Sequence, residues 1–158
     1  MTAQPPELFP ATPPLRILVV DDNIDGAETL CELLRSMGCT TAVAFDGAQG
    51  LATAAQFDPH LALIDLEMPG MNGLELARHL RASQPRSAAW LVCLTGRGRP
   101  DDRRLSEDAG FDEFFTKPIQ MHNLVRLVAD TTAALQRQYA QSKRHPSTVV
   151  WRVACPSP

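Results

Sequence analysis

The sequence predicts an α/β fold, a doubly wound sheet of five parallel strands with five helices. Short apolar, β-rich runs alternate with segments whose apolar residues recur at helical spacing, and this alternation repeats five times. The runs are almost continuously apolar, as expected of parallel strands that helices cover on both faces. Most of the runs stop abruptly at polar residues.

The strands follow from the β-rich runs. RILVV stops at Asp21-Asp22, and the third run stops at Asp65. The fourth stops at Thr95-Gly96, and the short fifth at Thr116-Lys117-Pro118. We expect Trp90, near the start of the fourth run, to lie in the core. In chain order, the predicted strands are 16–20, 40–45, 60–64, 89–94 and 112–115.

The helices follow from apolar spacing and from stop signals. Gly38 and Gly110 follow two of the periodic segments, as helix-ending glycines do. Asp46-Gly47 and Pro69-Gly70 are predicted turns. In chain order, the predicted helices are 25–36, 48–56, 74–81, 103–109 and a last one from near Ile119 to about Gln141.

Length and composition favour one soluble domain. The chain has 158 residues, 44% of them hydrophobic, with a net charge of -3. This charge gives no reason to expect direct binding to DNA or to an acidic membrane surface. No secretory signal or membrane-spanning run occurs, so we expect a cytoplasmic protein. None of the four cysteines forms a CxxC pair, and we expect Cys31 and Cys93 to be buried, reduced thiols.

Three regions differ in character. Residues 1–14 contain five prolines and are expected to be a disordered leader. Residues 15–130 carry the predicted domain. Residues 131–158 are expected to extend the last helix into a tail, which is too short for an output domain. The segment 142–158 contains VVWRVA and leaves three possibilities open: disorder, an extra strand or a docking peptide.

The predicted topology brings polar residues together. Right-handed crossovers place helices on both faces of a parallel sheet, and ligands bind beyond the carboxyl ends of its strands. Five polar residues follow strands one, three, four and five, so we expect their side chains to converge. These residues are Asp21, Asp22, Asp65, Thr95 and Lys117.

This set of side chains points to phosphoryl chemistry. Three neighbouring carboxylates repel one another unless a cation lies among them, and carboxylate oxygens suit Mg²⁺ (or Mn²⁺). A lysine and a threonine hydroxyl opposite the metal can hold phosphoryl oxygens. A carboxylate held by the metal can act as a nucleophile and form an acyl phosphate.

Residues 15 to about 128 resemble the receiver domain of response regulators, the CheY-like superfamily of two-component signalling. The matching segments are LRILVVDDNIDGAETL, LALIDLEMPGMNGLELARHLR, LVCLTGRG and AGFDEFFTKPI. The resemblance implies a flavodoxin-like receiver fold with strand order 2-1-3-4-5.

The resemblance implies roles for the acidic residues. Asp65 matches the phosphoacceptor, and Asp22 matches the direct metal ligand. Asp21 matches the acid that positions the metal through water. Glu67 would contribute its backbone carbonyl to the metal.

The resemblance also implies roles on the other side of the acceptor. Thr95 matches the switch hydroxyl and Lys117 the lysine that pairs with the phosphoryl group. Pro118 follows that lysine, in a peptide bond that is typically cis in the family. Gly96 would leave room beside the phosphoryl group. Phe114 occupies the aromatic switch position, where tyrosine is commoner.

The function implied is phosphoryl acceptance from a sensor histidine kinase or a histidine phosphotransfer domain. The fourth helix, fifth strand and fifth helix would form the face that changes on phosphorylation, with homodimerisation through it possible. We expect self-catalysed acceptance and slow autodephosphorylation, and therefore no enzyme in the ordinary sense. In a dimer built on the last helix, the seam would be Leu124, Leu127, Val128 and Leu135.

Other functions remain open. The chain could be a phosphate shuttle or sink, or a pseudo-receiver that binds partners without phosphorylation. An aspartyl phosphatase is disfavoured because Glu67 replaces the second aspartate of a D-x-D signature. Nucleotide binding by a P-loop is excluded, because no GxxxxGK[ST] segment exists.

Overall fold

The computed structural model describes residues 12–83 and 89–144, and these form the predicted α/β fold. Five parallel strands lie in the order β2-β1-β3-β4-β5, as predicted. The bounds of the strands are β1 Arg16–Val20, β2 Thr40–Ala44, β3 Leu61–Asp65, β4 Trp90–Thr95 and β5 Glu113–Thr116.

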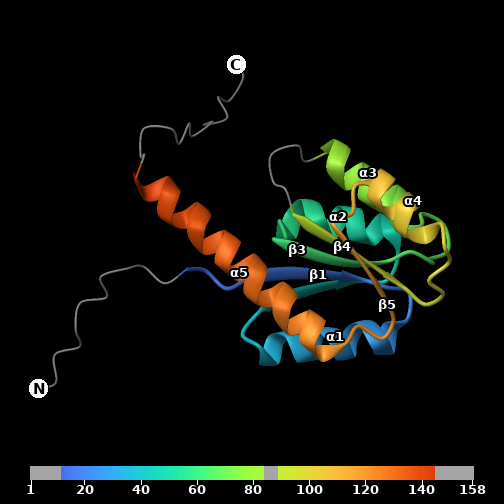
Figure 1. The fold of residues 1–158 in the computed structure, drawn as a ribbon, viewed down its shortest axis with the longest axis horizontal. Coiled ribbons are helices and arrows are strands. Elements are labelled where there is room, and N and C mark those ends of the chain that lie inside the picture. Colours follow the sequence, from blue (N-terminus) through green and yellow to red (C-terminus); the bar gives the residue numbers. More distant parts are fainter. Residues whose placement is uncertain (1–11, 84–88, 145–158) are drawn as a thin grey trace, which may run out of the picture.

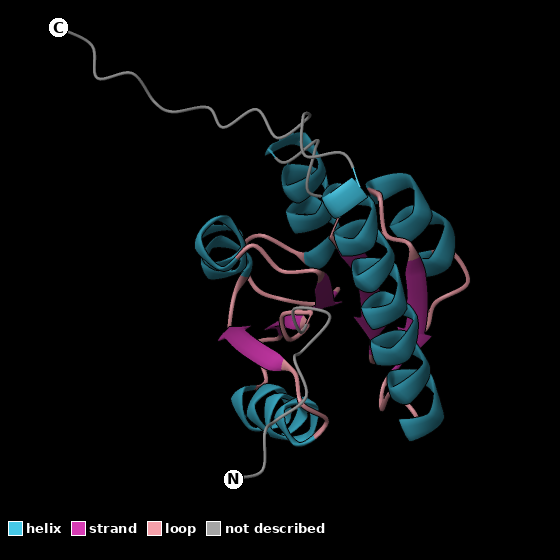
Figure 2. Cartoon of the chain, turned by 90° about the vertical axis from the view of Figure 1, so that its left-hand side faces the viewer, coloured by secondary structure: helices cyan, strands magenta, loops and turns pink. Residues whose placement is uncertain are grey.

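Helices cover both faces of the sheet (Figures 1 and 2). One apolar cluster packs α2, α3 and α4 against one face, and a second packs α1 and α5 against the other. These two clusters account for the apolar runs of the central strands, because the side chains of β1 and β3 meet helices on both faces of the sheet. The bounds of the helices are α1 Ile24–Ser36, α2 Gly47–Phe57, α3 Gly73–Ser83, α4 Asp102–Ala109 and α5 Met121–Arg144.

Capping residues set the helix starts, and they shift some predicted boundaries. The Asp46 side chain accepts a hydrogen bond from the backbone N–H of Gln49 at 2.7 Å, so α2 begins at Gly47, one residue before the predicted start. Asn23 caps α1 in the same way through Gly26. The predicted turn at 46–47 is thus the cap and first residue of a helix.

Two predictions about apolar side chains are wrong. Trp90 is 42% exposed, because it is the first residue of β4 and lies where the covering helices leave the sheet edge open. The proposed seam on the last helix is not an outward face. Leu124 and Leu127 are each 1% exposed in the domain's own core, and the other two seam residues pack against the same cluster.

Other expectations concern the cysteines and the ends of the chain. Cys31, Cys39 and Cys93 are buried and free, as expected for the two that were singled out. The last helix runs to Arg144, slightly beyond its predicted end. The predictions for residues 1–11 and 145–158 lie outside the described residues. Within the described part of the chain, no helix is both long and apolar enough to cross a membrane.

Candidate phosphoacceptor site

Strand register brings the predicted site residues to one edge of the sheet. Val20 of β1 pairs with Ile64 of β3, so the residues that follow them, Asp21 and Asp65, lie at the same level of the sheet. Asp65 itself pairs with Leu94 of β4. Asp21 and Asp65 therefore lie on neighbouring strand ends, as the topology predicts.

The same register carries the site across β4 and β5. Thr95 pairs with Thr116, and Lys117 comes next in the chain. The backbone N–H of Lys117 donates to the Thr95 carbonyl at 2.7 Å, which fixes the start of the lysine side chain beside β4. Thr95 is fully buried. The peptide bond between Lys117 and Pro118 is cis, as the family resemblance implies.

Lys117 links two of the carboxylates. Its Nζ lies 2.5 Å from Oδ2 of Asp21 and 3.4 Å from Oδ1 of Asp65. All three side chains are largely buried, so the charges meet where water screens them little. The lysine thus neutralises part of the negative charge that the sequence predicted would accumulate here.

The three predicted aspartates form one cluster. One carboxylate oxygen from each of Asp21, Asp22 and Asp65 lies within 4.8 Å of the other two. This spacing allows three hard oxygen ligands to reach a single small cation. Asp22 is exposed and Asp65 is buried, so such a cation would sit between the solvent and the acceptor. The donor set therefore fits a divalent cation that keeps some of its water.

Burial dominates the electrostatics of the acceptor. It raises the pKa of Asp65 from 3.8 to about 6, against the opposing influence of Lys117, while Asp21 raises it further. Burial by itself would lower the pKa of Lys117, but its contacts with Asp21 and Asp65 raise the pKa above its usual value. The lysine therefore stays charged while the acceptor carboxylate is costly to ionise.

Backbone N–H groups hold the site side chains in place. Oδ1 of Asp65 accepts from the N–H of Glu67 at 3.3 Å, and Oδ1 of Asp21 accepts from the N–H of Asn23 at 2.9 Å. Oγ1 of Thr95 accepts from the N–H of Arg97 at 3.4 Å. These three side chains are thus tied to the loops that follow their own strands. Sequence reasoning missed these anchors, although Asn23 was visible as a capping residue type.

Two glycines matter beside the acceptor. A Cβ at Gly73 would overlap the carbonyl oxygen of Asp65 and lie 2.9 Å from Cα of Leu66. The first turn of α3 can pack on the acceptor's backbone only because this residue has no side chain. A Cβ at Gly96 would meet no atom within 4 Å, so the chain leaves open space there.

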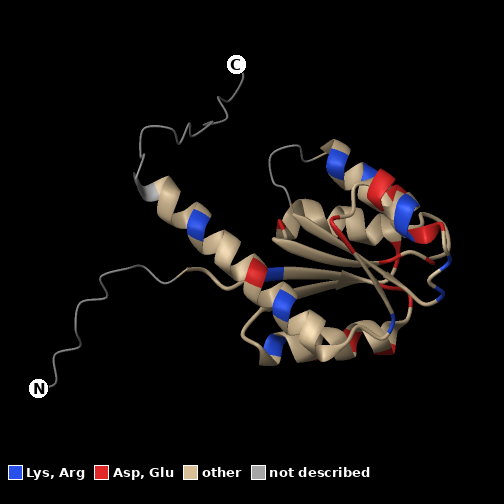
Figure 3. Cartoon of the chain, in the orientation of Figure 1, with Lys and Arg blue, Asp and Glu red and all other residues tan. Residues whose placement is uncertain are grey.

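Glu67 directs its side chain away from the aspartates. Its carboxylate lies 3.6 Å from Nε of Arg97 and 3.9 Å from Nη2 of Arg99. This agrees with the expectation that only its backbone carbonyl would serve a metal, although no contact tests that role. Figure 3 shows acidic segments in the loops at this end of the sheet, with acidic and basic residues alternating along α4.

The remaining predicted site residue is Phe114. It is half-buried and packs against the apolar cluster beneath α2, α3 and α4, while its neighbour Phe115 packs on the opposite cluster. This placement agrees with a packing role. Its proposed role as a switch stays a prediction.

Comparison with known families decides the family of this chain. The family model described as "Response regulator receiver domain" matches residues 17–129, which contain every predicted site residue. The chain belongs to this family. It is a receiver domain of two-component signalling, as its sequence motifs indicated.

Curated relatives include full response regulators. The DNA-binding response regulator MtrA of Mycobacterium tuberculosis is 42% identical over 113 residues, which cover 72% of this chain and 48% of MtrA. The transcriptional regulatory protein PrrA of Mycobacterium leprae is 33% identical over 134 residues, 85% of this chain and 55% of PrrA. The receiver chain thus spans about half the length of these relatives. Because MtrA is named a DNA-binding protein, the expectation that this chain does not bind DNA finds no support.

Solved structures agree on the fold. A CheY-like receiver domain protein from Methanospirillum hungatei is 25% identical with a TM-score of 0.72, over 79% of this chain and 98% of that one. The receiver domain of sensor histidine kinase PA1611 from Pseudomonas aeruginosa is 26% identical with a TM-score of 0.66, over 73% and 94%. The latter structure has a magnesium ion coordinated in its active site cleft.

Proposed function

We propose that this receiver domain accepts a phosphoryl group on Asp65 from a phosphohistidine of a sensor kinase or a histidine phosphotransfer domain. The observation that carries the proposal is the convergence of Lys117 on Asp65 and Asp21 at the carboxyl edge of the sheet, beside the three-aspartate cluster. An acceptor, a cation and a set of oxygen ligands are the parts that phosphoryl transfer to a carboxylate requires.

The acceptor is held for attack. Oδ1 of Asp65 is engaged by Lys117 and by the N–H of Glu67, while its Oδ2 has no hydrogen-bond partner among the described residues. In the proposed transfer, a carboxylate oxygen of Asp65 forms a bond to phosphorus as the bond from phosphorus to the histidine nitrogen breaks. The electron pair of that bond leaves with the imidazole.

Asp21, Asp22, Asp65 and the backbone carbonyl of Glu67 would hold Mg²⁺ or Mn²⁺. When bound, the ion would neutralise charge on the acceptor and the phosphoryl oxygens. Support comes from the spacing of the three carboxylates and from the magnesium seen in the PA1611 receiver. Asp22 lies at the exposed side of the cluster, where exchange with water is easiest.

Lys117 and Thr95 would receive the phosphoryl oxygens. Lys117 gives up part of its contact with Asp65 once the carboxylate has become an acyl phosphate, and its charge then pairs with the phosphoryl group. The hydroxyl of Thr95 donates a hydrogen bond from the neighbouring strand. Because Thr95 is fully buried, its movement would repack the strand end. That repacking would pass to α4, β5 and α5, shift the population of two states and change partner affinity.

The chemistry proposed is self-directed, with slow autodephosphorylation and no turnover of another substrate. A shuttle or sink would use the same site, so the geometry does not separate these roles. They differ in whether the phosphoryl group returns to a histidine protein. The DNA-binding name of MtrA belongs to a protein about twice as long, and DNA binding by this chain would need its own test.

The test is intact-mass measurement after incubation with acetyl phosphate and Mg²⁺. We expect one labile phosphoryl adduct on the native chain, none without a divalent cation and none on Asp65→Asn. Asp25→Asn serves as the control, because Asp25 is an exposed acid in the first turn of α1, outside the cluster. Loss of the adduct in the control as well would show a non-specific effect of removing charge.

An adduct that persists in Asp65→Asn would place the acceptor elsewhere. No adduct on the native chain, together with no binding of beryllofluoride, would instead favour a pseudo-receiver that binds partners without phosphorylation. If the native chain does form the adduct, transfer of the phosphoryl group from the phosphorylated chain to a histidine phosphotransfer domain separates a shuttle from a sink, since only a shuttle returns it.

A further inference from the structure

A cavity of about 760 Å³ lies at the amino edge of the sheet, the end opposite the acceptor. We call it the amino-edge groove. The starts of β1, β4 and β5 and the residues just before β3 line one side, and the stretch of α5 from Leu127 to Gln138 lines the other. Its volume lies in the range of sites that hold ligands. No residue of the proposed phosphoryl site lines it, so the groove is a second surface, independent of the proposed function.

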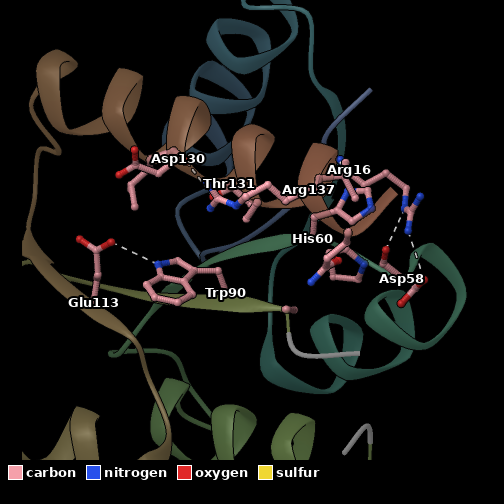
Figure 4. A pocket seen from close by; sticks show the side chains of 14 residues that line it. Arg16, Asp58, His60, Trp90, Glu113, Asp130, Thr131 and Arg137 are labelled. Carbon is pink, nitrogen blue, oxygen red and sulfur yellow. Dashed lines mark hydrogen bonds and ion pairs between the residues drawn. The ribbon is translucent and has the colours of Figure 1, made fainter. Parts of the chain in front are cut away.

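Trp90 gives the groove its chemical character. Figure 4 shows the indole ring between Glu113 and the residues His60 and Arg16. Its N–H donates to Oε1 of Glu113 at 3.2 Å, which fixes the ring, yet the residue remains 42% exposed. Pro59 and Leu135 add apolar surface. An exposed, fixed aromatic ring beside apolar side chains favours a ligand with apolar or proline side chains.

The charges of the groove are almost all paired. Its acidic residues take part in the ion pairs Asp58–Arg16 at 3.1 Å, Glu113–Arg126 at 2.7 Å and Asp130–Arg126 at 3.4 Å. Arg137, which also lines the groove, has no ion pair among the described residues. The groove therefore favours a ligand with a single negative charge near Arg137.

The chain carries a segment of this chemistry next to the groove. Arg16 lines the groove, and the Pro-rich leader leads directly into it through the half-buried Thr12 and Pro13. Residues 5–11 have the sequence PPELFPA, with three prolines, two large apolar side chains and one acid. Glu7 is the only charged residue among the first 14.

The tether is short enough for the leader to reach the groove. A random coil of seven residues, the separation of Phe9 from Arg16, spans about 15 Å on average, and an extended polyproline conformation of the same length spans about 22 Å. A short tether gives an effective concentration in the millimolar range, so a contact too weak to form between separate molecules is populated within one chain.

We propose that residues 5–11 dock within the same molecule in the amino-edge groove, with Phe9 against Trp90 and Glu7 facing Arg137. Proline residues restrict the free segment, so docking loses less conformational entropy than docking of an ordinary peptide. The docked leader ties the second half of α5 to the starts of the strands. It also covers the indole of Trp90. The docked leader thus gives a packing partner to a large aromatic side chain that the rest of the domain leaves exposed.

The test measures how accessible Trp90 is in the full chain. Trp151→Phe leaves Trp90 as the single tryptophan, and its fluorescence is then quenched with acrylamide. We expect a low quenching constant and blue-shifted emission. Phe9→Ser should raise the quenching constant and shift the emission to the red, whereas the control Ala3→Ser, outside the docking segment, should change neither.

A charge exchange tests the register of docking. Glu7→Arg alone and Arg137→Glu alone should each lower the ratio of docked to undocked leader by about two- to fivefold, as expected for an exposed ion pair. The double variant should restore the quenching constant toward its starting value. If a partner protein occupied the groove instead, the change at Glu7 would not restore the protection of Trp90 that Arg137→Glu removes.

Three results would overturn the proposal. If Phe9→Ser leaves the quenching constant unchanged, the leader does not cover Trp90. If protection is lost on dilution, a second copy of the chain occupies the groove. If Val150→Ser removes the protection and Phe9→Ser does not, the C-terminal segment is the occupant.

Discussion

A single buried carboxylate sets the character of this receiver domain. Asp65 is 5% exposed, and burial raises its pKa from 3.8 to about 6 even though Lys117 lies 3.4 Å away. An acid with a raised pKa in the folded state favours folding most when it is protonated. Its contribution to stability is therefore fully present below pH 3.8 and is lost as the pH rises through about 6.

Removing this charge should stabilise the chain when no divalent cation is present. At pH 7.5, we expect Asp65→Asn to raise the free energy of unfolding by about 1–3 kcal/mol, the upper value corresponding to the full rise in pKa. The asparagine still offers an oxygen to the N–H of Glu67. Urea denaturation at pH 7.5 and pH 3.5 checks the prediction, and the gain should vanish at the lower pH.

Adding Mg²⁺ should narrow the difference in unfolding free energy between Asp65→Asn and the native chain. The ion would stabilise the native chain alone, since a ligand that binds only the folded state adds to its stability. An equal gain at both pH values would show that the ionised carboxylate is not the source of the cost.

The site residues differ in how far sequence could predict them. Asp21, Asp65 and Lys117 follow apolar runs directly, so the strand-end rule is enough to place them together. Two other contacts depend on loop conformation, which no local sequence pattern specifies. They are the hydrogen bond from the N–H of Arg97 to Thr95 and the ion pairs of Glu67 with arginines. Sequence thus predicted that these side chains converge and missed the contacts that hold their neighbours in place.

At the scale of elements, α3 approaches the backbone of Asp65 so closely that its first residue must be glycine. We expect Gly73→Ala to lower the free energy of unfolding by about 1–3 kcal/mol, as overpacking does, and to slow phosphorylation, because the displaced atom is the carbonyl of Asp65. Chemical denaturation and the rate of adduct formation with acetyl phosphate check both effects.

The matched control is Gly26→Ala in α1. There a new Cβ meets nothing closer than 3.4 Å, and the residue lies in a helix, so stability should rise by about 0.5 kcal/mol. Similar effects of the two substitutions would mean that helix propensity, and not the close approach at Asp65, determines the result.

The protonation state of His60, the residue just before β3, affects how this residue pairs with the start of β1. The Arg16 N–H donates to Nδ1 of His60 at 2.9 Å, which requires the neutral ring. Burial lowers the pKa of His60, and the charge of Arg16 lowers it further, while Asp58 opposes them. The contribution of His60 to stability is therefore fully present above its usual pKa of 6.5. This contribution is lost as the pH falls below that value, because the unfolded state takes up the proton more readily.

His60→Asn offers a carbonyl oxygen where Nδ1 lies and does not titrate. We expect the two proteins to have similar unfolding free energies at pH 7.5, and the native chain to lose more stability than the variant between pH 7 and pH 5. Taking the difference between the two proteins cancels the titration of Asp65. Parallel pH profiles would contradict a neutral-ring requirement at this strand pair.

Sequence predicted the elements well where a local signal defines them. The strands were recognisable because apolar runs end at polar residues, and Asp46 could have been recognised as a cap rather than a turn. The exposure of Trp90 could not be predicted, because it depends on where α5 and the loops leave the sheet edge uncovered. That is a property of contacts between residues distant in sequence.

At the scale of the whole molecule, the two ends of the sheet carry different features. The carboxyl edge carries the three-aspartate cluster, at which we propose phosphorylation, and the amino edge carries the groove around Trp90. The helix α5 belongs to both regions. It starts a few residues after Lys117, and its second half forms one wall of the groove. A change in how β5 and α5 pack could thus reach the amino edge through one rigid element.

The packing of α5 decides whether that coupling is possible. Leu127 is 1% exposed and fills the cluster under α1 and α5, whereas Val125 on the same helix is 48% exposed. We expect Leu127→Ala to lower the free energy of unfolding by about 2–5 kcal/mol by leaving a cavity, with Val125→Ser as the control that changes it by less than about 0.5 kcal/mol. Denaturation with urea checks the loss, and light scattering over a dilution series checks the oligomeric state.

If Leu127 instead formed a seam between two copies, its replacement would leave monomer stability nearly unchanged and abolish a dimer. Its burial among Ile17, Leu34 and Leu63 in the same cluster predicts the opposite result, a less stable chain whose oligomeric state does not change.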